Sequence, residues 1–458
     1  MSSSLLILGA GRSSTSLVDY LLAHAAENRW TVTIADLSRE AAEKAAGGHP
    51  NARAVAADLS DEATLNGLMV QQKAVISLLP ADKHPTVARL ALQQKASLFT
   101  ASYVSPEMQQ LDPRAREAGL LFLNELGCDP GIDHMSTMEL LQPLQSQGAQ
   151  ITAFYSYTGG LIAPECDNPP WRYKFSWNPR NVVLAGFPGP AQYRYAHHTR
   201  HLPYHRLFRE PLHISVPGAG MLDAYPNRDS LPYAALYGLD DIPTLLRATF
   251  RYPGFMQGWS VLVHLGLTHH GHPLSAIKRS RRDLLTEFLP PHYGPDPEAA
   301  LNRVIVHDLG FSPAEAPGIM EQFRYLGFFD SIPLTGPAST PAECLEQILL
   351  AHWSLEPTDR DRVVMHHRVD YSLEGRAMTR TATLDLTGRD ATHTAMAQTV
   401  GLPLAIAVRL FMQGSLPLSG VLIPTLPDIY RPILRELSTH GIHFVETDTA
   451  QLPDPFTP

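Results

Sequence analysis

Two short stretches of the sequence have residue types and spacings that could do chemistry. The first, Gly9–Ser14, reads GAGRSS and follows an apolar run. Gly9 permits a tight turn, and Gly11 lets the backbone approach a pyrophosphate held at the start of a helix. The third glycine of this fingerprint is Ser14 here, so the match is partial and an empty Rossmann-like scaffold is the alternative to dinucleotide binding. The predicted cofactor contacts here are Gly9, Gly11, Arg12 and Ser13.

The second stretch, residues 124–134, reads NELGCDPGIDH, follows another apolar run and opens a helix. The backbone amides and acidic groups of this stretch are expected to face the sheet edge where a cofactor lies. Cys128 belongs to the same stretch and is a predicted cofactor contact. Asp129 has two interpretations: a helix N-cap followed by Pro130 as the first helical residue, or a carboxylate that faces a substrate amine. For Asp133 and His134 we expect helix-start stabilisation or core packing.

Asp36 closes the second predicted strand at about the usual offset from the glycines for a carboxylate that bonds the adenosine ribose. A carboxylate there repels a 2′-phosphate, so NAD(H) is favoured and NADP(H) is possible. Ser38 and Arg39 follow at once and could hold a phosphate instead. The alternative interpretation of Asp36 is a solvated acid at a strand end.

Other polar residues stand where predicted strands end. Asp58 ends the third strand and could approach the adenine or cap a turn. Residues 77–80 (SLLP) and 100–105 (TASYVS) end the fourth and fifth strands, and they place Leu79 and Thr100 at the carboxyl edge, where cofactors bind. Tyr103 could donate a proton or bind a substrate, or it could be a buried tyrosine with a satisfied hydroxyl.

Two arginines lie amid apolar and aromatic residues: Arg228 in AYPNRDS and Arg251 in TFRY. An unpaired guanidinium in such surroundings is costly. A bound carboxylate would satisfy each with a charge-assisted bond worth about 1.5–3 kcal/mol. The alternative is an internal salt bridge, for example of Arg228 with Asp229 or Asp223.

The elements that position these residues follow from the hydrophobic pattern. Short apolar runs alternate with helical patterns over residues 4–124, which predicts a doubly wound parallel sheet, an α/β fold. The six expected strands are 5–8, 31–35, 52–55, 74–78, 97–100 and 120–123. A β-hairpin is expected at 363–373 and 377–386 around Glu374-Gly375, and a late helix is expected to start near Pro403.

These patterns predict three domains. Residues 1–132 with 391–458 form a Rossmann domain, residues 133–264 with 360–390 an α/β substrate-binding and dimerisation domain, and residues 265–359 a small helical cap. A chain of 458 residues exceeds one ordinary core, which agrees with this division.

Bulk properties exclude several classes of function. The net charge of −9 and pI near 6.1 argue against nucleic acid as the main partner. Three cysteines without metal or disulfide spacing fit a reducing cytoplasm, and because the N-terminal residues include no basic segment, no secretory signal is expected. The apolar stretch 400–412 is interrupted by Gly401, Pro403 and Arg409, so no membrane span is expected. The histidine clusters at 264–272 and 366–367 lack ligand spacing, so no metal is expected.

Several motifs of the chain resemble those of saccharopine dehydrogenase of the glutamate-forming type, also called saccharopine reductase. The matching motifs are 100–106 (TASYVSP), 124–134 (NELGCDPGIDH), 157–165 (YTGGLIAPE), 167–170 (DNPP), 173–177 (YKFSW), 224–230 (AYPNRDS) and 420–424 (GVLIP). The likeness covers nearly the whole chain, and residues 265–360 are the least alike. The longer motifs are specific to this family.

The resemblance implies a homodimeric oxidoreductase that interconverts saccharopine with 2-aminoadipate 6-semialdehyde plus glutamate, by hydride transfer with a nicotinamide cofactor. It implies that Ser176 lies near the cofactor. The implied substrate-binding residues are Ser102, Tyr103, Asp129, Arg228, Thr249 and Arg251. As a hypothesis of our own, Asp129 and Tyr103 hold the substrate amine and assist proton transfer, and neither need be an indispensable base.

Two departures qualify this likeness. Family members that use NADP(H) have a sequence similar to Cys-Arg-Thr at the position where this chain has Asp36-Leu37-Ser38. The family also has a cysteine in a Tyr-Cys-Gly-Gly motif, and the corresponding residue in this chain is Thr158. Two other functions stay open: an imine reductase acting on carboxynorspermidine-like polyamines, and a non-catalytic NAD(P)-binding sensor.

Overall fold

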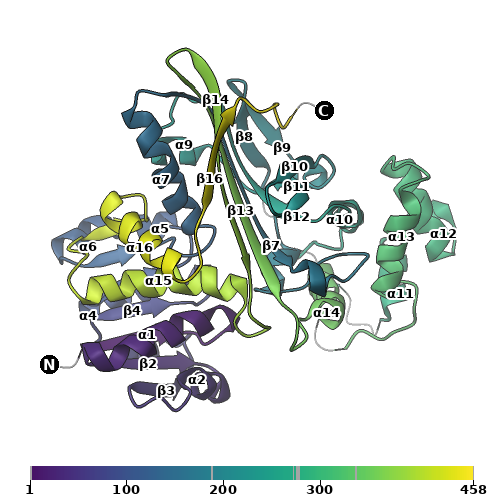
Figure 1. The fold of residues 1–458 in the computed structure, drawn as a ribbon. Coiled ribbons are helices and arrows are strands. Elements are labelled where there is room, and N and C mark those ends of the chain that lie inside the picture. The colour runs from purple at the N-terminus through teal and green to yellow at the C-terminus, as the bar shows by residue number, and fades with distance from the viewer. Residues whose placement is uncertain (1–2, 187–188, 272, 275–278, 336–337, 457–458) are drawn as a thin grey trace. The chain divides into compact units, whose positions relative to one another are not determined.

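The computed structural model describes residues 3–186, 189–271, 273–274, 279–335 and 338–456 (Figure 1). The chain forms two compact units. The first comprises Met1–Ala149 with Leu386–Val445, and the second comprises Gln150–Asp385 with Glu446–Pro458. Each unit therefore contains segments that are far apart in the sequence.

The first unit is built on a parallel sheet with the strand order β15-β6-β5-β4-β1-β2-β3. All six strands expected from the sequence are present. The strands are β1 (Ser3–Leu8), β2 (Trp30–Asp36), β3 (Ala52–Ala56), β4 (Ala74–Ser77), β5 (Ser97–Thr100), β6 (Leu121–Leu123) and β15 (Gly420–Leu422). The three-residue strand β15 was not foreseen, because so short a run carries no alternation.

Helices connect these strands, as the doubly wound pattern requires. They are α1 (Thr15–Asn28), α2 (Arg39–Ala46), α3 (Glu62–Met69), α4 (His84–Gln94), α5 (Pro106–Gln109), α6 (Asp112–Glu117), α7 (Ile132–Ser146), α15 (Ala395–Met412) and α16 (Pro427–Thr439). The expected start of a helix near Pro403 is wrong. Helix α15 begins at Ala395, because the hydroxyl of Thr394 caps it by accepting the N–H of Ala397 at 2.9 Å.

Helix α15 packs against α1 within this unit (Figure 1). A Cβ at Gly401 would lie 2.7 Å from the backbone nitrogen of Leu17, so only glycine allows this close approach. Helix α15 is long and apolar enough to cross a membrane by composition, but 78% of it is buried inside the structure. Burial of that extent is the environment of a core helix.

The second unit is built on a mixed sheet with the order β10-β11-β12-β7-β13-β14-β16, and β8 also pairs with β12 and β9. The strands are β7 (Gln150–Ile162), β8 (Ala191–Tyr195), β9 (His198–Leu202), β10 (Leu212–Val216), β11 (Gly220–Pro226), β12 (Thr244–Arg251), β13 (Asp361–Leu373), β14 (Arg376–Thr387) and β16 (Val445–Ala450). The expected hairpin is confirmed as β13 and β14. Glu374 and Gly375 have φ of 53° and 76°, as a tight hairpin turn with two left-handed residues requires.

Helices of the second unit include α8 (Pro179–Val183), α9 (Pro232–Leu236), α10 (Phe255–His264), α11 (Arg281–Phe288), α12 (Pro297–Arg303), α13 (Ala316–Tyr325) and α14 (Pro341–Trp353). An aromatic core that includes Trp171, Trp259 and Trp353 holds several of them together. The division of the chain into three domains stays a prediction.

Candidate active site

The loop between β1 and α1 has the form that a pyrophosphate needs. Gly9 has a φ of 101°, and its N–H donates to Ala35 O at 2.8 Å. A Cβ at Gly11 would meet nothing within 4 Å, so the space beside this backbone is open to a ligand. Ser14 replaces the third glycine without strain, because its hydroxyl donates back to Gly11 O at 2.7 Å. The loop therefore fits a dinucleotide, with the exposed Arg12 and the half-buried Ser13 beside it.

Asp36 holds the backbone of this edge together. Its Oδ2 accepts the N–H of Ala10 and its Oδ1 accepts the N–H of Ser38, both at 2.8 Å. The hydroxyl of Ser38 caps α2 by accepting the N–H of Ala41 at 3.2 Å. Arg39 follows with its side chain 74% exposed and 3.5 Å from Glu43. Both carboxylate oxygens of Asp36 are thus engaged by the chain itself.

Two further predicted cofactor residues lie along the same edge. Asp58 is exposed and accepts the N–H and the O–H of Ser60, at 2.9 and 2.6 Å, and these bonds lower the pKa of Asp58. It forms a turn, and the cap of α3 is Asp61 instead. Leu79 is half-buried and follows β4.

A hydrogen-bonded cluster lies where β4 and β5 end. The imidazole of His84 is buried, with its Nδ1 3.1 Å from Ser77 Oγ and its Nε2 2.8 Å from Ser102 Oγ. Thr100 Oγ1 lies 3.2 Å from the same Nε2 and accepts the N–H of Ser102. Burial lowers the pKa of His84 to about 4, against a weaker opposing effect of Asp82, so the ring is neutral at neutral pH.

Tyr103 and Asp129 meet at this carboxyl edge. The hydroxyl of Tyr103 donates to Asp129 Oδ1 at 3.2 Å, and both residues are half-buried. The structure thus joins the two residues for which a role in proton transfer was expected.

The expectation that Asp129 caps a helix with Pro130 in its first turn is wrong. The Asp129–Pro130 peptide is cis, and α7 begins two residues later, with Gly131 at the N-cap position. Asp133 Oδ1 accepts the N–H of Gly131 at 2.6 Å, so Asp133 stabilises the turn. A Cβ at Gly131 would lie 2.0 Å from Gly127 O, so glycine is required there. The cap position of α7 is thus occupied by Gly131 and not by Asp129.

A buried pair fixes the two loops of this edge to each other. Glu125 Oε2 lies 2.7 Å from His134 Nε2, and its Oε1 accepts the N–H of Val104 at 3.0 Å. The N–H of Glu125 donates to Ser102 O at 3.1 Å. Cys128 is also buried, and its carbonyl accepts the N–H of Asp133.

In the second unit, Arg251 at the end of β12 is a buried cation. It is 4% exposed, its Nη1 donates to Phe250 O at 2.8 Å, and its Nε has no hydrogen-bond partner. Its guanidinium carbon lies 5.0, 5.3 and 5.9 Å from the ring centres of Tyr173, Phe255 and Tyr225. Within the described parts of the chain, no carboxylate pairs with Arg251. This aromatic cage is suited to a cation that binds an anionic ligand.

The other predicted residues of the second unit have different environments. Arg228 is exposed, so the expectation that it lies in apolar surroundings is wrong: it follows β11, and its carbonyl accepts the N–H of Gln192 on β8 at 3.1 Å. Thr249 is half-buried on β12, directly opposite Thr158 on β7. Thr158 Oγ1, which stands where the family has a thiol, is buried without a partner. Ser176 is buried in the segment that precedes α8.

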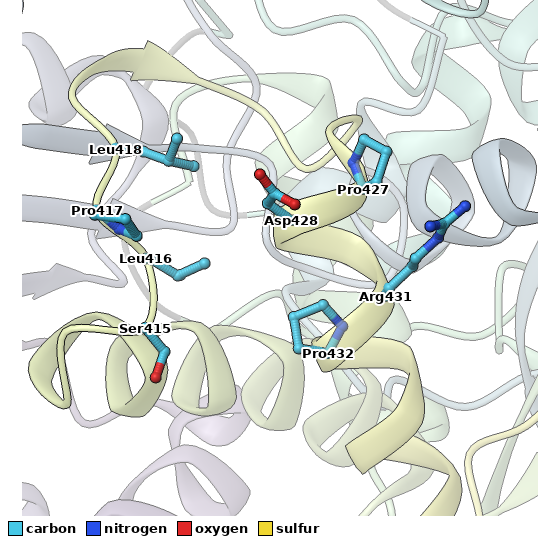
Figure 2. A pocket seen from close by; sticks show the side chains of 8 residues that line it. All are labelled: Ser415, Leu416, Pro417, Leu418, Pro427, Asp428, Arg431 and Pro432. Carbon is cyan, nitrogen blue, oxygen red and sulfur yellow. The ribbon is translucent and has the colours of Figure 1, made fainter.

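The first unit has a pocket of about 390 Å³. Figure 2 shows the residues that line it: Ser415, Leu416, Pro417, Leu418, Pro427, Asp428, Arg431 and Pro432. None of these is a predicted site residue, and prolines and leucines make up most of its wall. Across the described residues, no three His, Cys, Asp or Glu side chains are grouped to hold a metal ion.

Sequence reasoning missed His84 and Glu125. The signal for His84 was present, because it opens a helix shortly after a strand that ends in Ser77 at the ligand-binding edge. Glu125 was within a recognised motif, but nothing in the sequence indicated that it pairs with His134.

Comparison with known proteins covers nearly the whole chain. Residues 127–442 match the family model described as saccharopine dehydrogenase C-terminal domain, and residues 5–123 match the saccharopine dehydrogenase NADP binding domain. The chain is 32% identical to saccharopine dehydrogenase [NADP(+), L-glutamate-forming] of Pyricularia oryzae, over 97% of this chain and 98% of that protein. The same-named protein of Saccharomyces cerevisiae is 31% identical, over 98% and 100%.

Two further matches extend this likeness. Alpha-aminoadipic semialdehyde synthase of Bos taurus is 32% identical over 98% of this chain, which corresponds to 48% of that protein. The solved structure of apo saccharopine dehydrogenase (L-Glu forming) from Saccharomyces cerevisiae has a TM-score of 0.87, with 30% identity over 98% of this chain and 100% of that one.

These findings correct the predicted cofactor. The preference for NAD(H) inferred from Asp36 is wrong, since the matching domain is described as NADP binding and the fungal relatives are named as NADP(+) enzymes. Asp36 was a poor guide to cofactor preference because its two carboxylate oxygens accept the backbone N–H groups of Ala10 and Ser38 and so stabilise the loop.

The predicted α/β fold with a Rossmann sheet and the predicted family are confirmed. The chain belongs to the saccharopine dehydrogenase family.

Proposed function

We propose that this protein is an NADP(H)-dependent, L-glutamate-forming saccharopine dehydrogenase of lysine metabolism. In the oxidative direction, saccharopine, water and NADP⁺ give glutamate, 2-aminoadipate 6-semialdehyde, NADPH and a proton. Full-length matches to relatives of that name support this assignment. They also favour it over a polyamine imine reductase or a non-catalytic sensor.

The observation that carries the proposal is the aromatic cage of Arg251. Its buried guanidinium has no carboxylate partner among the described residues, which is costly unless a ligand supplies the negative charge. Saccharopine carries three carboxylates, and one of them satisfies Arg251. The exposed Arg228 and the half-buried Thr249 are proposed to bind the rest of the same substrate. Ser102 contributes a hydroxyl at the edge of the first unit.

The residues of the first unit fit a dinucleotide. Gly9, Gly11 and the start of α1 would hold the pyrophosphate, and Thr100 and Leu79 stand at the carboxyl edge of the sheet. When bound, the nicotinamide cofactor supplies the hydride acceptor or donor for the carbon attached to the secondary amine. Ser176 and Cys128 stay proposed cofactor contacts on the family likeness.

Tyr103 and Asp129 are proposed to handle the proton of the substrate amine. The Asp129 carboxylate attracts the positively charged amine, and the hydroxyl of Tyr103, bonded to Asp129 Oδ1, orients it. After oxidation of the carbon–nitrogen bond, water adds to that carbon, and breaking of the bond releases glutamate. These residues are proposed to increase the rate mainly by holding the substrate in the reactive position.

For the 2′-phosphate of NADP(H), we propose Ser38 and Arg39 at the start of α2. Arg39 is exposed and the helix N-terminus favours an anion. Arg39→Ala should raise the KM for NADPH about tenfold and leave the KM for NADH unchanged, since one charge-assisted bond is lost. Equal effects on both cofactors would contradict this assignment.

The function is tested by steady-state kinetics of Arg251→Met with saccharopine and NADP⁺. We expect kcat/KM to fall about a hundredfold or more, because a charge-assisted bond is lost in a desolvated site. The matched control is Arg206→Met, which removes an exposed arginine paired with Glu210. Wild-type kinetics of Arg251→Met, or equal turnover of carboxynorspermidine by the wild-type protein, would contradict the proposal.

A homodimer and a cytoplasmic location are also proposed. The first rests on the family likeness and the second on a low cysteine content. Sedimentation equilibrium and cell fractionation test them.

A further inference from the structure

The cluster around His84 joins three hydroxyls from two neighbouring strand ends. Ser77 ends β4, Thr100 ends β5, and Ser102 lies two residues beyond Thr100. All three hydroxyl oxygens lie within 3.2 Å of a ring nitrogen of His84. The ring therefore fixes Ser102 Oγ relative to the carboxyl edge of the sheet.

The chemistry of a carboxylate ligand decides how the protons of this cluster are arranged. A hydroxyl has one proton, and a carboxylate can only accept hydrogen bonds. If Ser102 donates its proton to a substrate carboxylate, its 2.8 Å contact with His84 must be a bond that Ser102 accepts. The donor is then the Nε2–H of His84.

The other side of the ring follows from its charge. Since burial keeps the ring neutral, it carries one N–H only, and that proton is on Nε2. Nδ1 then accepts the hydroxyl proton of Ser77, which is 1% exposed and has this single side-chain contact. Thr100 Oγ1, at 3.2 Å, shares the Nε2–H as a second acceptor.

We propose that His84 is a positioning residue which, as the Nε2–H tautomer, turns Ser102 into a hydrogen-bond donor for a substrate carboxylate. This inference rests on the proposed function, which has a carboxylate-bearing substrate. Ser102 touches the substrate, and His84 acts through it. Ser77 is the residue that selects the tautomer.

The experiment compares four variants by kinetics with saccharopine. His84→Leu fills the volume without a donor, and His84→Gln keeps an N–H near the position of Nε2. The third variant is Ser102→Ala, and the fourth combines His84→Leu with Ser102→Ala. His443→Leu, at an exposed position of the same unit, is the matched control. Titration with NADPH and thermal unfolding of each variant report on folding and cofactor binding.

We expect His84→Leu and Ser102→Ala each to raise the KM for saccharopine about tenfold, the value of one lost hydrogen bond, with kcat and the Kd of NADPH close to wild type. His84→Gln should restore most of the loss. The double variant should match Ser102→Ala, because His84 has nothing to orient once the hydroxyl is absent. A purely structural role would lower stability and add to the effect of Ser102→Ala.

Different outcomes separate the failure of this inference from the failure of the proposed function. A raised KM in Ser102→Ala together with a wild-type KM in His84→Leu, or with additive effects in the double variant, overturns the role of His84 alone. A wild-type KM in both Ser102→Ala and Arg251→Met overturns the proposed function. A ¹⁵N spectrum of the saccharopine complex gives a direct check: the resonances missing from His84→Gln should show a protonated Nε2 and an unprotonated Nδ1, and the reverse pattern overturns the tautomer.

Discussion

Two buried arginines on the sheet of the second unit have opposite surroundings. Arg368, on β13, forms a bidentate pair with Asp370 at 2.9 and 2.8 Å and donates to the carbonyls of Pro453 and Leu452. Arg251, on β12, has one carbonyl and three aromatic rings but no acid among the described residues. The chain compensates the first cation completely, and the second has no such acid partner among the described residues.

The contrast is not caused by a lack of acids near β12. Asp223 on β11 is directly opposite Arg251 in the register, yet its carboxylate lies 2.7 Å from Nδ1 of His213 on the next strand. On β13, in contrast, Arg362 pairs with Asp385 as closely as Arg368 pairs with Asp370. Among the described residues, Arg251 therefore stays without an acid although one lies opposite it in the register, which supports its proposed role in binding a ligand.

The largest effect is expected from Arg368→Met. This change leaves the Asp370 carboxylate buried with Thr379 as its remaining side-chain partner, and such an uncompensated charge costs about 3–5 kcal/mol. The thermal unfolding midpoint should fall by about 5 °C, measured by calorimetry. Adding Asp370→Leu should recover much of the loss, since it removes the isolated charge. An unchanged midpoint in Arg368→Met would remove the distinction between the two arginines.

Acid should destabilise the paired strand through His366. The imidazole of His366 bonds Thr383 Oγ1 at 2.8 Å, and burial, with a contribution from the charge of Arg368, lowers its pKa to about 4. The unfolded chain binds a proton at about pH 6.5 and the folded chain does not, so stability is complete above that pH and is lost as the pH falls toward 4. The full loss is about 3 kcal/mol. His366→Asn should flatten this part of the pH–stability curve, measured by urea unfolding, and an equally steep curve would contradict the assignment.

Much of this arrangement followed from the sequence, for physical reasons. The parallel sheet was predictable because six buried strands give continuous apolar runs between helical patterns. The hairpin of β13 and β14 was predictable because Glu374-Gly375 interrupts two alternating runs. In the site, glycines and arginines could be selected by type, since their conformational freedom and charge are local properties.

Other features depend on contacts that no local pattern contains. Asp36 looked like a ribose ligand, and only its bonds to Ala10 and Ser38 show that it serves the loop. Helix α7 begins at Ile132 with Gly131 at its N-cap position, although aspartate followed by proline is typical of a helix start. Arg228 and Arg251 were equivalent in sequence and differ in burial, because one follows a strand and the other ends one inside an aromatic core.

Saccharopine should stabilise the protein through Arg251. At a concentration 100 times its Kd, a ligand that binds only the folded chain adds about 2.7 kcal/mol. The thermal midpoint of the wild-type protein should therefore rise in saccharopine, in the presence of saturating NADPH. The same addition should leave Arg251→Met nearly unchanged. A full shift in that variant would show that the ligand is held elsewhere.

The smallest change in stability is expected for Arg251→Met without ligand, and it tests the difference between Arg251 and Arg368 most directly. Arg251→Met removes a buried cation that the described chain does not compensate, and the methionine can fill part of the aromatic cage. Its stability without ligand should therefore stay within about 1 kcal/mol of wild type, or rise, while kcat/KM for saccharopine falls. The matched substitution at Arg368 should do the reverse. Urea unfolding in ligand-free buffer checks this, and a loss comparable with that of Arg368→Met would mean that Arg251 is a structural residue, whatever its effect on turnover.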